Sequence, residues 1–422
     1  MKLKNRTLLQ QMSLVISPLA LLALAPEAYS ADSFTEAVTG GKVSADLQYR
    51  YENVNQQNAL KTAKASTARL RLGYETAEFM GFGAKVELEH LTANSAYNSR
   101  ENRKTNYSVV ADPEYTELNE AYISYSGVPQ TKLKLGRQEI IYDNHRWIGN
   151  VAWRQNHQSF DGYTAVNKTL PDTTIQAAYL TNVNRVFSDG SIDNGSGSFL
   201  GNHHMQSPLV NVKYSGLGFA DIIGYGYFLN YDPSALAFGT KNSTATKGIR
   251  LIGSAPIGGY KALYTAEYAS QSDYKSTNNY RADYYLVEGG VDVKVATIKV
   301  GYELLGSNKG QSIQTPLATL FAHNGWADQF LVTPTNGLQD VYVAARTNLG
   351  GFVPGVVLGA DYHDFRADQG NQKYATEIDL IAEKAFNKTY SVGTRAAFFS
   401  AKSSYTAGTD VTKLWLYGSM KF

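Results

Sequence analysis

The segment KVSADLQYRYEN, residues 42–53, decides the fold class. Successive side chains of an extended strand point to opposite faces. One face of this segment is therefore polar, with Asp46, Gln48, Arg50 and Glu52, and the other is apolar, with Ala45, Leu47, Tyr49 and Tyr51. A run of this length, with tyrosine on its apolar face, is typical of a strand that crosses a bilayer in a tilted barrel.

The same alternation recurs to the end of the chain. The next two segments place Arg69 and Arg71 opposite Leu70 and Leu72, and Lys85 and Glu87 opposite Val86 and Leu88. Fifteen further segments begin near Thr116, Thr131, Ser159, Thr173, Pro208, Asp221, Ala245, Lys261, Ala282, Ala296, Leu338, Val356, Tyr374, Tyr390 and Asp410. We therefore expect about eighteen strands.

The connections between these segments alternate in length. Short ones cover 126–129, 167–171, 255–259 and 386–389, whereas long ones cover about 92–115, 139–158, 183–207 and 305–337. This alternation predicts an all-β, transmembrane, antiparallel up-and-down barrel with short periplasmic turns and long extracellular loops. A secreted β-sandwich or propeller, the soluble alternative, gives no reason for loop lengths to segregate in this way.

Both ends of the chain indicate export to the outer membrane of a Gram-negative cell. Lys2, Lys4 and Arg6, followed by a short apolar run and small residues up to Ser30, predict a signal peptide over 1–30. Residues 31–422 would form one barrel domain. Cleavage of this peptide would remove three of the 39 basic residues and one of the 37 acidic residues, Glu27, and would leave 36 of each. The mature chain would then have no net charge, which indicates no nucleic-acid partner. The terminal Phe422 resembles the aromatic residue that the barrel-assembly machinery reads.

Arginines on the predicted inward face are candidates for pore-lining groups. They are Arg50, Arg69, Arg71, Arg250, Arg346 and Arg395. Barrel closure would bring Arg395 near Arg50, Arg69 and Arg71, forming a positive strip that could pass an anionic sugar. Neutralising Arg69 and Arg71 should then shift ion selectivity toward cations. The alternative is that these arginines form wall ion pairs with the many inward-facing carboxylates.

The stretch from Leu135 to Tyr163 is unusually rich in tryptophan and arginine for a connection. We expect it to narrow the lumen, with Trp147 and Trp153 at the constriction, because functional residues concentrate on loops held by a rigid scaffold. The alternative is that the two tryptophans only anchor the loop. The candidate pore-lining or substrate-binding residues of this stretch are Arg137, Arg146, Arg154 and Asp161. Arg137 shares parity with Leu133 and Leu135, so a bulge must intervene or it leaves the membrane.

Two segments resemble the alginate export family of outer-membrane barrels. The first contains Leu-Gly-Arg-Gln at 135–138, Trp-Arg-Gln-Asn at 153–156 and Phe-Asp-Gly at 160–162. The second contains Gln-Thr-Pro-Leu-Ala-Thr at 314–319, Gly-Trp-Ala-Asp at 325–328 and Thr-Pro at 333–334. The resemblance implies an eighteen-stranded barrel whose lumen passes anionic polyuronates such as alginate. One departure is that the inferred lumen has at least as many acidic as basic groups.

The sequence thus predicts a passive outer-membrane channel, with no enzymatic activity, no cofactor and no metal. The alternative is that the chain is a general or OprD-like porin for small solutes. An outer-membrane enzyme or an adhesin remains a weaker alternative, because no catalytic motif appears and fewer strands suffice for a filled barrel. The expected partners are outer-membrane lipid and lipopolysaccharide, the barrel-assembly machinery and an anionic saccharide, and we expect a monomer.

Overall fold

The computed structural model describes residues 30–191, 195–232, 236–276, 279–349, 353–370 and 372–422. The predicted signal peptide therefore lies almost entirely outside the described residues. Two short α-helices, α1 (Phe34–Thr39) and α2 (Leu236–Asn242), and a 3₁₀ helix, η3 (Leu320–Ala322), accompany the strands. Within the described chain, no helix combines the length and the hydropathy that a membrane-spanning helix needs.

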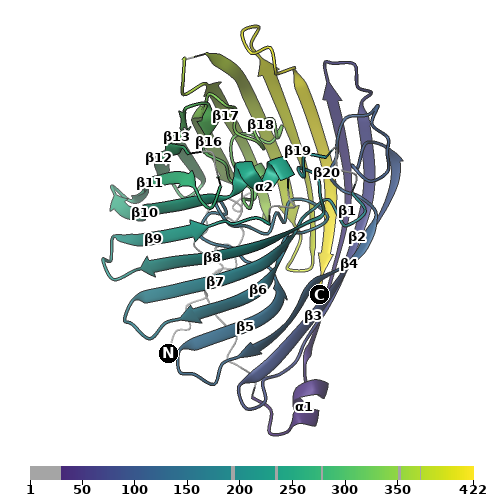
Figure 1. The fold of residues 1–422 in the computed structure, drawn as a ribbon, viewed down its shortest axis with the longest axis vertical. Helices are drawn as coiled ribbons and strands as arrows, with labels where there is room; N and C mark the ends of the chain where they lie inside the picture. Colours follow the sequence, from purple (N-terminus) through teal and green to yellow (C-terminus); the bar gives the residue numbers. More distant parts are fainter. Residues whose placement is uncertain (1–29, 192–194, 233–235, 277–278, 350–352, 371) are drawn as a thin grey trace.

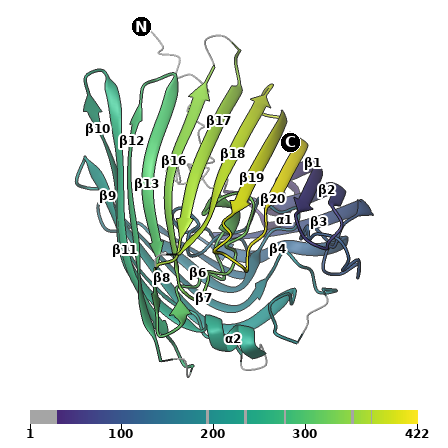
Figure 2. The ribbon, with the colours of Figure 1, turned by 90° about the horizontal axis from the view of Figure 1, so that it is seen from above.

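Eighteen antiparallel strands form one sheet (Figures 1 and 2). The first nine are β1 Lys42–Gln56, β2 Ala63–Glu75, β3 Phe82–Ala96, β4 Tyr115–Tyr125, β5 Thr131–Gln138, β6 Ser159–Asn167, β7 Thr173–Asn184, β8 Asn202–Tyr214 and β9 Ala220–Phe228. The others are β10 Thr244–Ile257, β11 Tyr260–Asp273, β12 Arg281–Asp292, β13 Ala296–Leu305, β16 Leu338–Asn348, β17 Val356–Arg366, β18 Lys373–Ala385, β19 Tyr390–Ala401 and β20 Val411–Lys421. The predicted strand number is confirmed.

The sheet closes on itself because the first strand pairs with the last. β1 pairs antiparallel with β20 from Asp46↔Lys421 to Gln56↔Val411, and with β2 on its other side. Figure 1 shows this closure where the purple β1 lies beside the yellow β20. Closure removes the free edges that an open sheet would expose.

Two elements of the long connections were not predicted from the alternation. A small hairpin of β14 (Ser307–Asn308) and β15 (Gln311–Ser312) lies after β13, and α2 lies between β9 and β10. In addition, β8 begins at Asn202 and not near Pro208, because His203 pairs with Val183 and extends the ladder. The short and long connections otherwise alternate as predicted.

The two faces of the wall differ as the sequence predicts. Large apolar side chains are exposed on the outer face, including Leu47, Tyr49, Val287 and Ile378. Arg50, Glu52 and other polar side chains have the opposite parity and point inward. This arrangement puts the apolar band where lipid would lie and the charges where water or loops would lie.

The interior is packed unevenly along the barrel. In β1 the inward-facing Arg50, Glu52 and Val54, toward the long loops, are buried, whereas Asp46 and Gln48 are partly exposed. The same gradient occurs in β13, where Glu303 is buried and Lys299 is partly exposed. Loops therefore fill the half of the lumen next to the long connections, and the half next to the short turns stays accessible.

Candidate channel constriction

The connections 139–158 and 306–337 fold inward and bind each other inside the barrel. The Gly149 N–H donates to the Leu317 carbonyl at 2.9 Å, and the Thr319 N–H donates to the His145 carbonyl at 3.0 Å. The Gln158 amide donates to the carbonyl of Leu317 at 3.1 Å. The predicted narrowing by 139–158 thus involves a second loop, whose role the sequence analysis did not assign.

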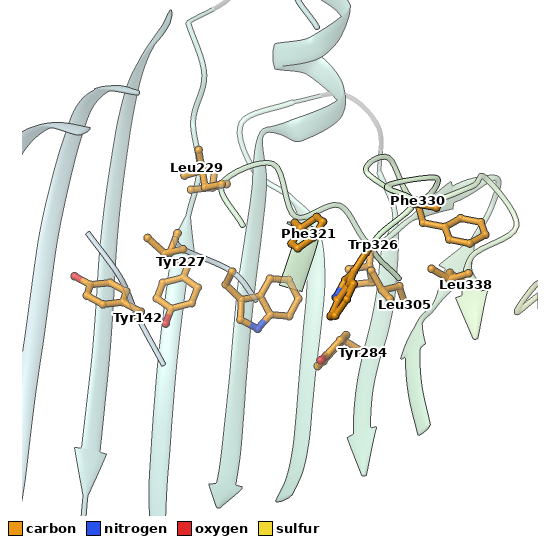
Figure 3. Close-up of a cluster of buried hydrophobic side chains, with 14 of the residues drawn as sticks. Tyr142, Tyr227, Leu229, Tyr284, Leu305, Phe321, Trp326, Phe330 and Leu338 are labelled. Carbon is orange, nitrogen blue, oxygen red and sulfur yellow. The ribbon is translucent and has the colours of Figure 1, made fainter. Parts of the chain in front are cut away.

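Aromatic rings form the contact between the two loops and the wall (Figure 3). Trp153 stacks on Phe321 of the other loop, with ring centroids 4.0 Å apart, and lies edge-on to Trp415 of β20. Trp147 contacts Tyr284 of β12 edge-on and donates its indole N–H to Glu267 at 3.0 Å. Both predicted constriction tryptophans therefore pack between loop and wall, which is also what the anchoring alternative requires.

Wall carboxylates hold the loop 306–337 through its backbone. The Trp326 N–H donates to Asp379 at 3.1 Å and the Ala327 N–H donates to Glu377 at 2.6 Å. Between them and Asn324, Gly325 has a φ of +83°, and a Cβ there would lie 2.4 Å from a Glu377 oxygen. Only glycine fits this turn without displacing the clamp.

Asn324 extends the same clamp to two more strands. Its side-chain amide donates to Glu303 of β13 at 2.7 Å and to Asp340 of β16 at 3.1 Å, and its oxygen accepts from Arg146 at 3.0 Å. Four acidic side chains on one side of the wall are thus used to fix the loop. These acidic groups therefore serve to hold the loop 306–337 in place inside the barrel.

Arg50 and Arg395 are brought together at Trp153, as expected from closure. Their guanidinium carbons lie 4.3 Å and 4.5 Å from the centroid of the Trp153 ring. The Nε and Nη1 of Arg50 are buried without a hydrogen-bond partner among the described residues, and its ion-pair partner Asp112 is 3.8 Å away. Arg395 pairs with Glu383 at 3.0 Å.

Arg69 and Arg71 are held by acidic neighbours and by a shared histidine. Arg69 pairs with Asp46 at 3.0 Å, and Arg71 pairs with Glu87 at 2.5 Å. Guanidinium nitrogens of both arginines lie within hydrogen-bond distance of His157 from the inward loop. The positions of the predicted strip are therefore neighbours, but its charge is largely compensated, and its role in selectivity stays a prediction.

Four more predicted arginines also have inward positions and acidic partners. Arg154 bridges Glu52, Asp112 and Asp328, and Arg146 lies 2.9 Å from Glu303. The other two pairs are Arg250 with Glu267 at 3.7 Å and Arg346 with Asp361 at 2.5 Å. The first three arginines are buried, whereas the side chain of Arg346 is 17% exposed at the accessible half of the lumen.

Arg137 and Asp161 differ from the pore-lining position predicted for them. The register runs from Leu133 to Arg137 without a shift, so no bulge turns Arg137 inward, and Asp161 keeps the parity of the exposed Tyr163. Arg137 binds Asp161 through two hydrogen bonds at 2.7 Å and 3.1 Å. The pair therefore belongs to the outer side of the wall, near the point where the chain leaves β5.

Ionisable groups of the inward loops respond to burial and to each other. Burial raises the pKa of Asp143 to about 6, although Asn211 donates a hydrogen bond to its carboxylate at 2.7 Å. Burial also lowers the pKa of His323 well below its usual range, with help from Arg146 and His145. Burial alone would raise the pKa of Glu139, but the neighbouring His157 and Arg71 hold that pKa well below its usual range. These shifts follow from the burial of the loop 139–158 and its partners inside the barrel.

The sequence analysis missed the partners on the second loop and on the acidic wall. Phe321, Trp326 and the clamp carboxylates lie far from 139–158 in sequence, so only the folded barrel brings them together. The signal in the sequence is the Gly-Trp-Ala-Asp motif at 325–328, which indicates the family resemblance but not a structural role.

Comparisons with known proteins agree with the barrel fold. A family model described as Alginate export matches residues 41–300. Among solved structures, OccAB4 of Acinetobacter baumannii aligns with a TM-score of 0.71 at 14% identity over 90% of this chain and 98% of its own. OccK9 (OpdG) of Pseudomonas aeruginosa aligns with a TM-score of 0.71 at 14% identity, over 92% of this chain and 99% of its own. OpdK of the same organism aligns with a TM-score of 0.68 at 12% identity, over 91% of this chain and 99% of its own. No curated protein matches the chain.

Proposed function

Because this chain belongs to the alginate export family and is an outer-membrane channel, we propose that it lets short anionic saccharides and similar small carboxylated solutes diffuse through the lumen. The transport is passive, since the solute only exchanges hydration water for fixed groups of the channel. The narrow part lies where the two inward loops meet the accessible half of the barrel.

The observation that carries the proposal is the position of Trp326 between two guanidinium groups. The guanidinium carbon of Arg395 lies 4.8 Å from the Trp326 ring centroid, and that of Arg346 lies 5.7 Å from it. Arg395 also contacts the Tyr417 hydroxyl at 3.2 Å and pairs with Glu383, whose side chain is 25% exposed. Trp326 and Arg395 are themselves nearly buried, at 8% and 5% exposed, so only the edge of this platform at Glu383 and Arg346 borders the water-accessible half of the lumen.

The platform fits the two chemical parts of a carboxylated sugar. A pyranose ring stacks its C–H face on an indole, and its carboxylate pairs with a guanidinium that stays charged at all physiological pH values. The acidic partners Glu383 and Asp361 keep each arginine from binding an anion too tightly. Weak binding of this kind is what conduction requires.

The packed half of the lumen favours short solutes over a long polymer. Arg50, Phe321 and Trp415 are buried at the level of the loop contact. A polyuronate chain would have to displace the stack of Trp153 on Phe321, whereas a solute of a few rings needs smaller movements of the same loops. The charge compensation of the wall is also compatible with a general small-solute porin. The experiment below distinguishes such a porin from a saccharide channel.

The test is a planar bilayer containing the purified full-length mature barrel. Uronate oligomers of two to four rings, added to one side, should block the current in a concentration-dependent way. The double variant Arg395→Gln, Arg346→Gln should lose at least about tenfold in blocking affinity, because one charge-assisted pair contributes about 1.5–3 kcal/mol. A neutral oligosaccharide of equal length should block neither protein.

Lys85→Gln with Lys213→Gln is the matched control. Both lysines face inward, are ion-paired to Glu120 and Asp221, and change the charge by the same amount as the arginine variant. Both double variants should shift the reversal potential toward cations, but only the arginine variant should lose the block. Equal block in all three proteins, or no block of the wild type, would contradict the saccharide proposal and favour a general small-solute porin.

A further inference from the structure

A groove of about 580 Å³ lies on the outer face of the barrel across β19, β20 and β1, next to the short-turn end. Its floor is at Gly418, which pairs with Tyr49 on one side and Val392 on the other. Gly418 has no side chain to fill the space. The Tyr49 hydroxyl is within 2.9 Å of Ser66 on β2, so the ring is held on the side away from Gly418.

The walls of the groove are apolar and exposed. Leu47 and Met420 line one side, and Val392, Tyr390 and Phe386 line the other. Tyr390 and Phe386 are 46% and 59% exposed and flank the 386–389 turn. Aromatic rings at this level are typical of the boundary between hydrocarbon and headgroups, so the groove runs from the interface into the bilayer.

Cationic side chains stand at the mouth of the groove. Lys384 lies next to the last residue of β18, with its ammonium 5.5 Å from the Phe386 ring centroid, and Lys388 is exposed in the turn. Within the described ranges, neither lysine has an ion-pair partner. Lys421 of β20 does not belong to this set, because it has the inward parity of Trp415 and pairs with the inward-facing Asp46 at 3.5 Å. An apolar groove with lysines at its interfacial end matches a lipid with an anionic headgroup.

We propose that this groove binds an anionic phospholipid of the periplasmic leaflet, with one acyl chain over Gly418 and the phosphate near Lys384 and Lys388. The short turns mark the periplasmic side of the membrane, where the leaflet consists of phospholipid. The bound lipid covers the seam between β1 and β20, where the barrel closes. It lies on the opposite side of the wall from the channel, so its binding is independent of the transported solute.

The test is native mass spectrometry of the delipidated full barrel after addition of phosphatidylglycerol. The wild type should retain one phosphatidylglycerol and prefer it over phosphatidylethanolamine by at least severalfold. Gly418→Leu fills the groove, because a Cβ at Gly418 meets only ordinary contacts at 3.7 Å and beyond, and it should reduce retention about tenfold. Lys384→Gln with Lys388→Gln should remove the headgroup preference without touching the closing strands.

Gly289→Leu is the matched control. Gly289 lies on β12 in the periplasmic half with the same outward parity as Val287, and a Cβ there meets nothing within 4 Å. This variant should retain the lipid at the wild-type level, and all variants should keep wild-type single-channel conductance as evidence of folding. Equal retention in Gly418→Leu and wild type would overturn the proposal. So would equal loss in the Gly289 control, lipid A bound in preference to phospholipid, or a second copy of the chain occupying the groove.

Discussion

Trp153 shows how one side chain connects the wall, both inward loops and the arginines. Its ring stacks on Phe321, and the guanidinium groups of Arg50 and Arg395 lie over the same ring. From sequence alone this tryptophan was a candidate for a constriction or for an anchor. The contacts satisfy both descriptions, because a loop can narrow a lumen only if something holds it there.

Trp153→Ala should loosen the contact between the loops and increase single-channel conductance. Truncation of a packed tryptophan costs about 3–5 kcal/mol, which is enough to change how often the loops separate. Current traces should show larger steps and more noise than the wild type. Phe386→Ala, which removes an exposed ring from a periplasmic turn, is the control and should leave the traces unchanged. If Trp153→Ala conducts like the wild type, the stack does not limit the pore.

Asp143 predicts a pH dependence of the loop 139–158. Its pKa of about 6 in the folded protein lies above the value of a free aspartate, so the packed loop favours the protonated carboxyl. The stability that this protonation gives to the packed loop is complete below about pH 4 and is lost as the pH rises through about 6. The linkage is at most about 3 kcal/mol.

The measurement for Asp143 is open-channel current noise between pH 4.5 and 7.5. Noise from this loop should rise with pH in the wild type and should rise less in Asp143→Asn, which keeps an oxygen for Asn211. Asp172→Asn, in a periplasmic turn, should follow the wild type. Identical pH profiles for wild type and Asp143→Asn would show that this carboxyl does not control the loop.

At the scale of elements, the strands were predictable because lipid on one side and a polar interior on the other impose a period of two. The exceptions are local. β3 and β4 change register between Glu87 and Leu88, and β6 and β7 do so at Asp161. Such bulges depend on neighbouring strands and are not visible in the parity of one strand. Arg137 and Asp161 keep the outward parity of Leu135 and Tyr163, so a charged side chain alone does not identify the inward face.

The inward loops were not predictable to the same degree. The density of tryptophan and arginine in 139–158 indicated its place, but its binding partner 306–337 follows β13, more than a hundred residues later. The contact depends on barrel closure and on backbone donors at Trp326 and Ala327, which have no sequence pattern of their own.

Gly325→Ala should release the loop 306–337 from the acidic clamp. The new Cβ would collide with Glu377 at 2.4 Å, and the positive φ adds strain of about 1 kcal/mol or more. We expect faster proteolysis within 314–330 and higher conductance. Gly310→Ala is the control, because its φ of +74° carries the same strain but a Cβ there meets only Thr335 at 3.9 Å. Equal effects in both variants would assign the change to backbone strain and not to the clamp.

For the whole molecule, the closed wall, the apolar outer band and the two inward loops describe a channel whose diameter depends on loop packing and not on strand number alone. Polar groups throughout the accessible half are paired across neighbouring strands, as in Lys299 with Glu288 and Lys213 with Asp221. Such pairing keeps the lumen hydrated without a large net charge, which is consistent with the proposal that the loops select the solute.

Single-channel conductance in a planar bilayer tests this account most directly. The wild type should give discrete current steps, and a variant in which a short glycine–serine linker replaces 314–330 should give larger ones, because the second loop no longer packs against Trp153. Absence of ion current in both proteins, with the barrel shown to be folded, would contradict the account.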